Sequence, residues 1–482
     1  MSATAVTTRP RVAVVGGGIA GLAAALEVLT ARPDADVVVL EGSDRPGGKL
    51  RLEDVAGHRV DVGAEAMLAL RPEAVDLATR VGAGPDLVAP ATTSASVWSR
   101  GRLHRLPRAT LMGVPTDAES ARGILDDGEV ARVRAERPWP GGAVTEDVSV
   151  GDYVGTRLGR PVVDRLVEPL LGGVYAGHAS RLSLEATMPV LWARAVAGES
   201  LLSAPGGDRP APSSGSGRPV FAGVRGGVGR LPELVAAELG RLGAVIRTGA
   251  MVRGLERSGH GWRLVVGSAA APETVEADAV VVCVPPAPAA RLLRPHAPSA
   301  AARLGEVETA STVVVTLAVE RAAVGELPGS GFLVPPVERR AIKASTFSFR
   351  KWEWTGALSD DVVHLRTSLG RAGEVATLQH EDEDLVAVSV AELSEAVGRP
   401  VPRVHDAHVQ RWGGGLPQYA VGHLGRVRAV RDALEDLPGL EVAGAAYDGV
   451  GIPAVVASAT RAAQAVTDHL STVANPSGEH PR

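Results

Sequence analysis

The stretch VAVVGGGIAGLAAALEVL at residues 12–29 decides the fold. An apolar run near an N-terminus is typical of a secretion signal, a membrane anchor or the first strand and helix of a nucleotide-binding fold. A signal peptide has a basic segment before the run and a cleavage site soon after it, but here a loop and a second apolar strand, DVVVLE (36–41), follow. A membrane helix needs about 20 apolar residues, and three consecutive glycines would weaken its middle. The nucleotide-binding fold is the interpretation that fits.

The glycines of this stretch form the pattern G-x-G-x-x-G between a predicted strand, RVAVV (11–15), and a predicted helix. Gly16 permits a tight turn, Gly18 allows a pyrophosphate to approach the backbone, and Gly21 lets the helix pack on the strand. The phosphates would then lie at the N-terminus of that helix. Glu41 ends the second strand, where an acidic side chain binds both ribose hydroxyls and disfavours the 2′-phosphate of NADP.

Composition sets broad limits on the kind of protein. The 482 residues are enough for two or three lobes. A net charge of −5 does not indicate a basic surface that would bind nucleic acid or a polybasic patch that would bind a membrane. Cys283 is the single cysteine, which excludes an internal disulfide and a cysteine-based metal cluster. Its setting, AVVVCVP, predicts a small core residue on a buried strand, and no integral membrane segment is expected. We therefore expect a cytoplasmic protein without a bound metal.

Three further segments indicate FAD rather than NAD. The pattern Arg45-x-Gly47-Gly48 in GSDRPGGKL resembles the second fingerprint of flavoproteins of the amine-oxidase and porphyrinogen-oxidase superfamily. A cation beside a second glycine turn adds charge and backbone N–H groups for a diphosphate. The small residues of GAEA (63–66) let the backbone lie against a flat ring. GLEVAGAAYDGVGIPAVVASATRAAQAV (439–466) repeats the strand, glycine turn and helix, which a nicotinamide enzyme would rarely need.

The middle of the chain carries a more specific resemblance. VEPLLGGVYAGHASRLSLEATMPVL (167–191) closely resembles the porphyrinogen-oxidase signature, and FAGVRGGVGRLPELVAAEL (221–239) and RWGGGLPQYAVGHL (411–424) are similar to two other segments of that family. The best match is to the coproporphyrinogen III oxidases of Gram-positive bacteria. His178 stands where many members have an acidic residue.

The resemblance implies a reaction and a set of ligands. FAD, held non-covalently, would oxidise coproporphyrinogen III to coproporphyrin III in three two-electron rounds of haem biosynthesis. O2 would reoxidise the flavin to give H2O2, and the product would pass to a ferrochelatase. The alternatives are a protoporphyrinogen IX oxidase, a flavin amine oxidase and a non-catalytic porphyrin-binding flavoprotein.

The fingerprints and the resemblance together predict the site residues. The cofactor-binding residues are Gly16, Gly17, Gly18, Ile19, Ala20, Gly21, Glu41, Gly42, Arg45, Gly48, Lys49, Gly63, Ala64, Glu65, Ala66, Val252, Trp412, Val450, Gly451 and Ile452. A tetracarboxylate substrate needs cations, and Arg71 matches a basic position of the family; a helix-capping or surface arginine is the other interpretation. Weaker candidates are Lys343, Arg350 and Lys351, while Tyr175 and Tyr419 are expected to pack. No residue is marked by the sequence as an acid or base.

The expected fold class is α/β with several lobes. A Rossmann-like FAD-binding domain would comprise residues 1–70, 215–285 and 425–470. Residues 90–210 would form an α-helical lobe, and residues 286–424, with 71–89, an antiparallel-sheet substrate domain. The composition of segment 203–219 predicts a Pro/Gly/Ser connector, and residues 471–482 are expected to form a frayed tail.

Overall fold

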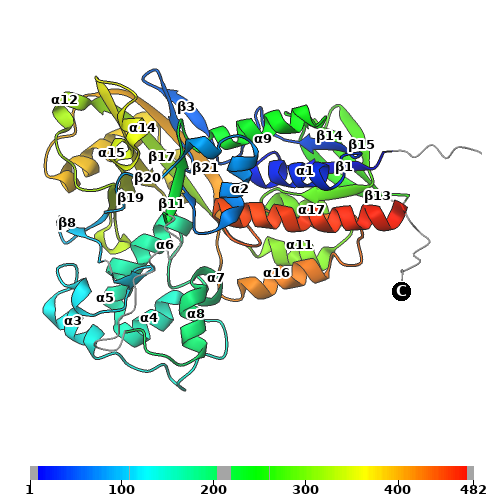
Figure 1. Ribbon diagram of the computed structural model, residues 1–482. Helices are drawn as coiled ribbons and strands as arrows, with labels where there is room; N and C mark the ends of the chain where they lie inside the picture. Colours follow the sequence, from blue (N-terminus) through cyan, green and yellow to red (C-terminus); the bar gives the residue numbers. More distant parts are fainter. Residues whose placement is uncertain (1–8, 108, 203–218, 260, 475–482) are drawn as a thin grey trace, which may run out of the picture.

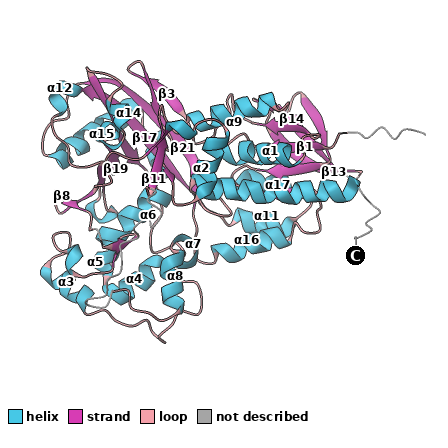
Figure 2. Ribbon diagram, viewed as in Figure 1, coloured by secondary structure: helices cyan, strands magenta, loops and turns pink. Residues whose placement is uncertain are grey.

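The computed structural model describes residues 9–107, 109–202, 219–259 and 261–474. Figure 1 shows three regions: a parallel sheet between helices, a second large sheet, and a group of helices below that sheet. Figure 2 shows the strands gathered in the two sheet regions. Most of the expected connector, 203–218, and the end of the expected tail, 475–482, lie outside the described residues.

The first sheet is parallel throughout. Its strands, in spatial order, are β12 (Val245–Arg247), β2 (Asp36–Leu40), β1 (Arg11–Val15), β16 (Ala279–Val282) and β22 (Leu440–Val442). Successive residues of β1 enter two different cores: Val12 and Val14 pack on one face, Ala13 and Val15 on the other. This burial on both faces explains why the strands read as continuous apolar runs.

Helices cover both faces of the parallel sheet. The core on the first face contains residues of α1 (Ile19–Ala31), α2 (Pro72–Arg80), α9 (Arg230–Arg241) and α17 (Ile452–Ala474). The opposite core contains residues of α10 (Pro286–Leu293), α11 (Pro298–Gly305), α16 (His423–Asp432) and the antiparallel strands β13 (Val252–Ser258), β14 (Gly261–Gly267) and β15 (Pro272–Ala277). Figure 1 shows α1 and α17 side by side.

The second sheet has seven strands and lies beside the carboxyl edge of the first. Their order is β21 (Val404–Pro417), β17 (Thr309–Glu320), β20 (Val362–Leu369), β19 (Ile342–Thr346), β18 (Gly331–Leu333), β7 (Ser96–Ser99) and β8 (Arg102–Arg105). All pairings are antiparallel except that of β18 with β7. Val313 and Val315 share a core with residues of α15 (Asp382–Val397), whereas Thr312 and Val314 line a cavity on the other face. Short helices α12 (Arg321–Val324), α13 (Ser348–Lys351) and α14 (Glu353–Gly356) connect the strands.

Smaller elements join the regions. They are the hairpin β3 (Leu52–Val55) and β4 (His58–Asp61), the hairpin β9 (Thr110–Leu111) and β10 (Val114–Pro115), and the strands β5 (Met67–Leu68), β11 (Phe221–Val224) and β6 (Leu87–Val88), which pair in that order.

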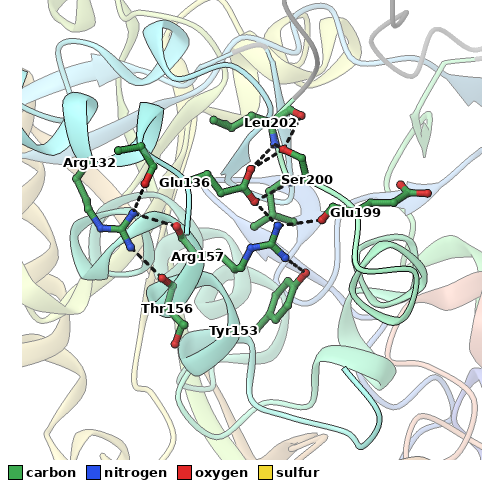
Figure 3. A network of polar contacts seen from close by, with 10 residues as sticks. Arg132, Glu136, Tyr153, Thr156, Arg157, Glu199, Ser200 and Leu202 are labelled. Carbon is green, nitrogen blue, oxygen red and sulfur yellow. Dashed lines mark hydrogen bonds and ion pairs between the residues drawn. The ribbon is translucent and has the colours of Figure 1, made fainter. Parts of the chain in front are cut away.

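The helical region has its own apolar core. Its helices are α3 (Asp127–Arg134), α4 (Val150–Leu158), α5 (Arg160–Val162), α6 (Glu168–Tyr175), α7 (Leu184–Thr187) and α8 (Pro189–Val196). Asp126 and Glu129 form a capping box at the start of α3, and Ser149 caps α4. In Figure 3, the guanidinium of Arg157 lies between the carboxylate of Glu136, the hydroxyl of Tyr153 and the carbonyl of Glu199. None of the helices in the described ranges combines the length and apolarity needed to cross a bilayer.

Several expected boundaries are wrong. Residues 96–105, assigned to the helical lobe, form two strands of the seven-stranded sheet. Helices α10 and α11 were assigned to the substrate domain, but they pack on one face of the parallel sheet. Helix α2, from segment 71–89 of the same expected domain, packs on the other face. The tail does not fray at 471, because α17 continues to Ala474. In the first two cases an apolar helix face or strand edge packs against a partner distant in sequence, whereas residues 471–473 are exposed and simply continue α17.

Candidate functional site

A cavity of about 540 Å³ lies where the three regions meet. The loops that follow β1, β16 and β22 contribute Gly18–Ala20, Cys283–Pro286 and Gly444–Ala446. The opposite wall comes from β17, β19, β20 and β21, and Gly173 and Val174 of α6 complete the lining. The carboxyl edge of a parallel sheet is where open α/β folds bind their ligands.

The two glycine turns predicted from the sequence lie against each other. Gly47 donates its N–H to the carbonyl of Gly17 at 2.8 Å. A Cβ at Gly21 would lie 1.9 Å from the carbonyl oxygen of Gly16, so no side chain fits where α1 crosses β1. Apart from the adjoining backbone, no atom of the described residues lies within 4 Å of the position that a Cβ would take at Gly18. The backbone at Gly18 is therefore open for a ligand to approach.

The carboxylate of Glu41 stabilises the first glycine turn through hydrogen bonds. Its carboxylate accepts N–H groups from Gly17 at 2.6 Å and Ser43 at 2.8 Å. A Cβ at Gly42 would meet the side chain of Met251, which immediately precedes Val252. Glu41, Gly42 and Val252 thus lie near one another and outside the cavity lining, and the sequence predicts that they contact the adenosine end of a dinucleotide.

Two helix N-termini meet at the cavity. Gly18, Ile19 and Ala20 belong to the start of α1, and Val450 and Ile452 to the start of α17. Each helix begins with N–H groups that have no partner inside the helix, and each carries a partial positive charge there. Gly451 lies at the same point, its carbonyl accepting the N–H of Val455 at 3.0 Å. This arrangement suits a diphosphate and an electron-rich ring system.

Arg45 and Lys49 differ in what they contact. The guanidinium of Arg45 donates to the carbonyls of Pro46 at 3.1 Å and Gly48 at 3.0 Å and thereby holds the second turn. Lys49 lines the cavity, enclosed by protein atoms but reachable from within the cavity, and burial lowers the pKa of its ammonium.

Glu65 lies between two cations of the opposite wall. It accepts Lys351 Nζ at 2.6 Å and Arg366 Nη1 at 2.7 Å, and its carboxylate also accepts the hydroxyl of Ser348. Burial opposes ionisation, but the two cations outweigh it and lower the pKa of Glu65 to about 2. Glu65 is expected from the sequence to serve the cofactor; the structure adds that it ties the GAEA loop to the seven-stranded sheet.

The remaining predicted residues divide by location. Gly48, Gly63, Ala64, Ala66 and Trp412 line the cavity, and Trp412 approaches within 3.3 Å of the position that a Cβ would take at Gly63. Arg71 does not: it lies just before α2, its side chain is 42% exposed, and it pairs with Glu73. Of the weaker candidates, Lys343 and Lys351 line the cavity and Arg350 does not. Sequence reasoning missed Arg366, whose position on an alternating strand carried no motif.

Cys283 packs against the core, as expected from the sequence, but it is not wholly enclosed there. It follows the end of β16, is only partly buried and lines the cavity, where burial raises the pKa of its thiol to about 12. The tyrosines pack as expected: Tyr419 stacks on His423 and approaches Tyr175 with ring centroids 5.5 Å apart. No group of three or more metal-ligating side chains occurs among the described residues.

The residues present fit a flavin dinucleotide. A glycine turn open at Gly18, a second glycine turn packed against it, two helix N-termini and a mostly apolar cavity lie along the carboxyl edge of the parallel sheet. Comparison with known proteins agrees. A family model described as flavin containing amine oxidoreductase matches residues 19–467.

The chain belongs to the flavin-containing amine oxidoreductase family.

Within that family, this chain is similar to coproporphyrinogen III oxidases. The protein of that name from Mycobacterium leprae is 38% identical over 459 residues, which covers 94% of this chain and 97% of the relative. The Bacillus subtilis protein of the same name is 30% identical and covers 92% of this chain and 95% of the relative. A solved structure described as a putative protoporphyrinogen oxidase from Exiguobacterium sp. 255-15 superposes with a TM-score of 0.82 at 30% identity, covering 95% and 99% of the two chains. The predicted fold class, flavin cofactor and oxidoreductase class are confirmed.

Proposed function

We propose that this protein oxidises coproporphyrinogen III to coproporphyrin III in haem biosynthesis, with non-covalently bound FAD and with O2 as acceptor. The observation that carries the proposal is the cavity itself, which has the flavin-binding loops on one wall and cationic strands on the other. The names of the relatives supply the substrate class. A cytoplasmic location and transfer of the product to a ferrochelatase belong to the same proposal.

The protein residues would do three kinds of work. The glycine turns and the N-termini of α1 and α17 would bind the dinucleotide, with Glu41 on the ribose side. When bound, FAD supplies two-electron oxidation, the part of the chemistry that amino-acid side chains cannot provide. Glu65, Lys351 and Arg366 would keep the opposite wall at a fixed distance from the ring, and the apolar lining from Val314, Leu333 and Leu416 would exclude water from the macrocycle.

A second candidate is protoporphyrinogen oxidase. The observations that favour it are the similarity to the Exiguobacterium structure and to the chloroplastic protoporphyrinogen oxidase of rice, which is 28% identical over 506 residues. The two substrates differ in charge, because coproporphyrinogen carries four propionates and protoporphyrinogen two.

Steady-state oxidation of the two porphyrinogens decides between them. Under anaerobic conditions, coproporphyrinogen should bleach the yellow flavin of the purified protein, and in air its kcat/KM should exceed that of protoporphyrinogen at least tenfold, about 1.4 kcal/mol of transition-state stabilisation. A reversed ratio would establish the second candidate, and a flavin that neither substrate bleaches would exclude both.

A further inference from the structure

Lysine is rare in this chain and is confined to one place. The sequence contains 50 lysines and arginines, of which only Lys49, Lys343 and Lys351 are lysine. All three line the cavity. A lysine differs from an arginine in being able to lose its proton when its surroundings require it.

The three lysines have different partners. Lys351 pairs with Glu65, and Lys49 stands next to the second glycine turn, on the cofactor side. Lys343 is on the strand wall, only 5% exposed, and donates to the carbonyls of Leu369 at 3.1 Å and Gly370 at 2.8 Å. Within the described ranges, no carboxylate lies within 4.0 Å of its ammonium.

A bulge aims Lys343 at the cavity. In the pairing of β19 with β20, Ile342 opposes Leu369 and Ala344 opposes Ser368, so Lys343 is the extra residue. Ile342 packs into the core beneath α15, while Ala344 and Lys343 line the cavity. Bulges of this kind redirect a side chain beside a binding site.

The acidic groups around Lys343 accept backbone N–H groups elsewhere, although the charge of Glu374 still raises the pKa of the ammonium and one oxygen of Glu168 has no partner among the described residues. Glu392 of α15 accepts the N–H groups of Ala341 and Ile342, and Glu168 of α6 accepts that of Ala179. Glu374 accepts the N–H of Arg371, the other buried cation of this corner. Tyr175 of α6 is also on an element packed against β19, but burial raises the pKa of its hydroxyl to about 12, so it stays neutral.

Burial and the neighbouring Arg371 lower the pKa of Lys343 to about 7. A neutral amine would use both N–H groups on the two carbonyls, whereas the ammonium has a third N–H for a ligand. An acidic ligand would therefore be bound together with a proton.

We propose that Lys343 binds one carboxylate of an acidic cavity ligand. This rests on the proposed function, in which the ligand is a porphyrinogen with propionate side chains. Lys343, and not Arg71, then supplies a cation for a carboxylate of the substrate.

The test measures binding of air-stable coproporphyrin III to the flavin-loaded protein by fluorescence quenching. Lys343→Met should weaken binding about tenfold to a hundredfold, as expected for a hydrogen bond between charged groups. Lys343→Arg should retain most of the affinity. Arg102→Met is the matched control: it removes one exposed positive charge from β8 of the same sheet and should leave the affinity unchanged.

The pH dependence of coproporphyrin affinity provides a second readout. It would not change if Lys343 had a purely structural role. Wild-type affinity should fall by up to about tenfold per pH unit above pH 7, because the neutral amine must take up a proton to pair. In Lys343→Arg this slope should disappear.

A third readout depends neither on enzyme activity nor on the affinity of a variant. Biosynthetic incorporation of ¹³C-labelled lysine leaves every Nζ–H in place, and with only three lysines in the sequence the Lys343 signal is the one lost in Lys343→Arg. Its pKa should rise when coproporphyrin is added.

The outcomes separate the two proposals. Wild-type binding that Lys343→Met does not weaken, or a Lys343 signal indifferent to coproporphyrin, would overturn this inference and leave the proposed function standing. Absence of coproporphyrin binding to the wild type would overturn the proposed function as well.

Discussion

Arg366 and Glu65 form an ion pair at 2.7 Å across 301 residues of sequence. Both side chains are about nine-tenths buried, and Arg366 also donates to the carbonyl of Gly63. The pair joins the GAEA loop beside the predicted flavin to the strand wall that faces it. The width of the cavity is thus fixed by charge as well as by packing.

Glu65→Gln should lower the free energy of unfolding by about 3–5 kcal/mol, because it leaves the buried Arg366 and the partly buried Lys351 without a counter-charge. Chemical denaturation followed by fluorescence measures this. Glu276→Gln is the matched control: it breaks an exposed pair with Arg263 and should change the denaturation midpoint very little. Equal midpoints for the two variants would show that the Glu65 pair contributes nothing to stability.

The same carboxylate predicts an acid dependence. Its folded-state pKa of about 2 is below the ordinary value of 4.5, so its contribution is complete above pH 4.5 and is lost as the pH falls towards 2. We expect the free energy of unfolding to fall more steeply between about pH 5 and pH 3 in the wild type than in Glu65→Gln. Parallel curves would assign the acid sensitivity to other carboxylates.

Glu41→Ala should weaken FAD binding by about 1–3 kcal/mol, through the lost ribose contact and a loosened first turn. Titration of the flavin-free protein with FAD measures the affinity. Asp44→Ala is the control, since Asp44 is exposed in the same loop. If Glu41→Ala bound FAD as tightly as the control, Glu41 would have no part in the site.

The flavin should be released by acid precipitation or boiling. No cysteine or histidine of the sequence is in a setting typical of flavin attachment, and the raised pKa of the Cys283 thiol keeps it protonated. The absorbance of supernatant and pellet checks this directly. Yellow colour retained in the washed pellet would demonstrate a covalent bond.

Arg157→Met should destabilise the helical region by about 3–5 kcal/mol, because it leaves Glu136 buried without its partner. Figure 3 shows Arg157 paired with Glu136. Arg157 is only 5% exposed, and Glu136 also accepts the N–H of Leu201. Limited proteolysis should cleave the variant between residues 127 and 202 while the flavin spectrum stays intact. Arg134→Met, at an exposed pair with Glu119, is the control and should resist the protease as the wild type does.

The sequence by itself determined the nucleotide-binding fold and most of the cofactor side of the site. A strand, a glycine turn and a helix are contiguous, and Gly21 is required because a Cβ there would meet the carbonyl of Gly16. Gly16 itself has a φ of +105°, although a Cβ there would also meet the carbonyl of the distant Cys283. The same holds for the second turn and for the start of α17. Local patterns of this kind can be recognised in a sequence without knowledge of distant contacts.

Only the tertiary structure decided the opposite wall. Arg366 and Lys343 lie on strands whose alternation predicts two faces but not which face meets a cavity. A bulge in the pairing of β19 with β20 turns Lys343 inward, and Glu65 finds its partners about 300 residues away. Arg71 matched a family position, yet a carboxylate two residues further along the chain pairs with it. The Arg71 pair is local, but strand register and the partners of Glu65 are set by contacts between distant segments, so they become fixed only when the chain is folded.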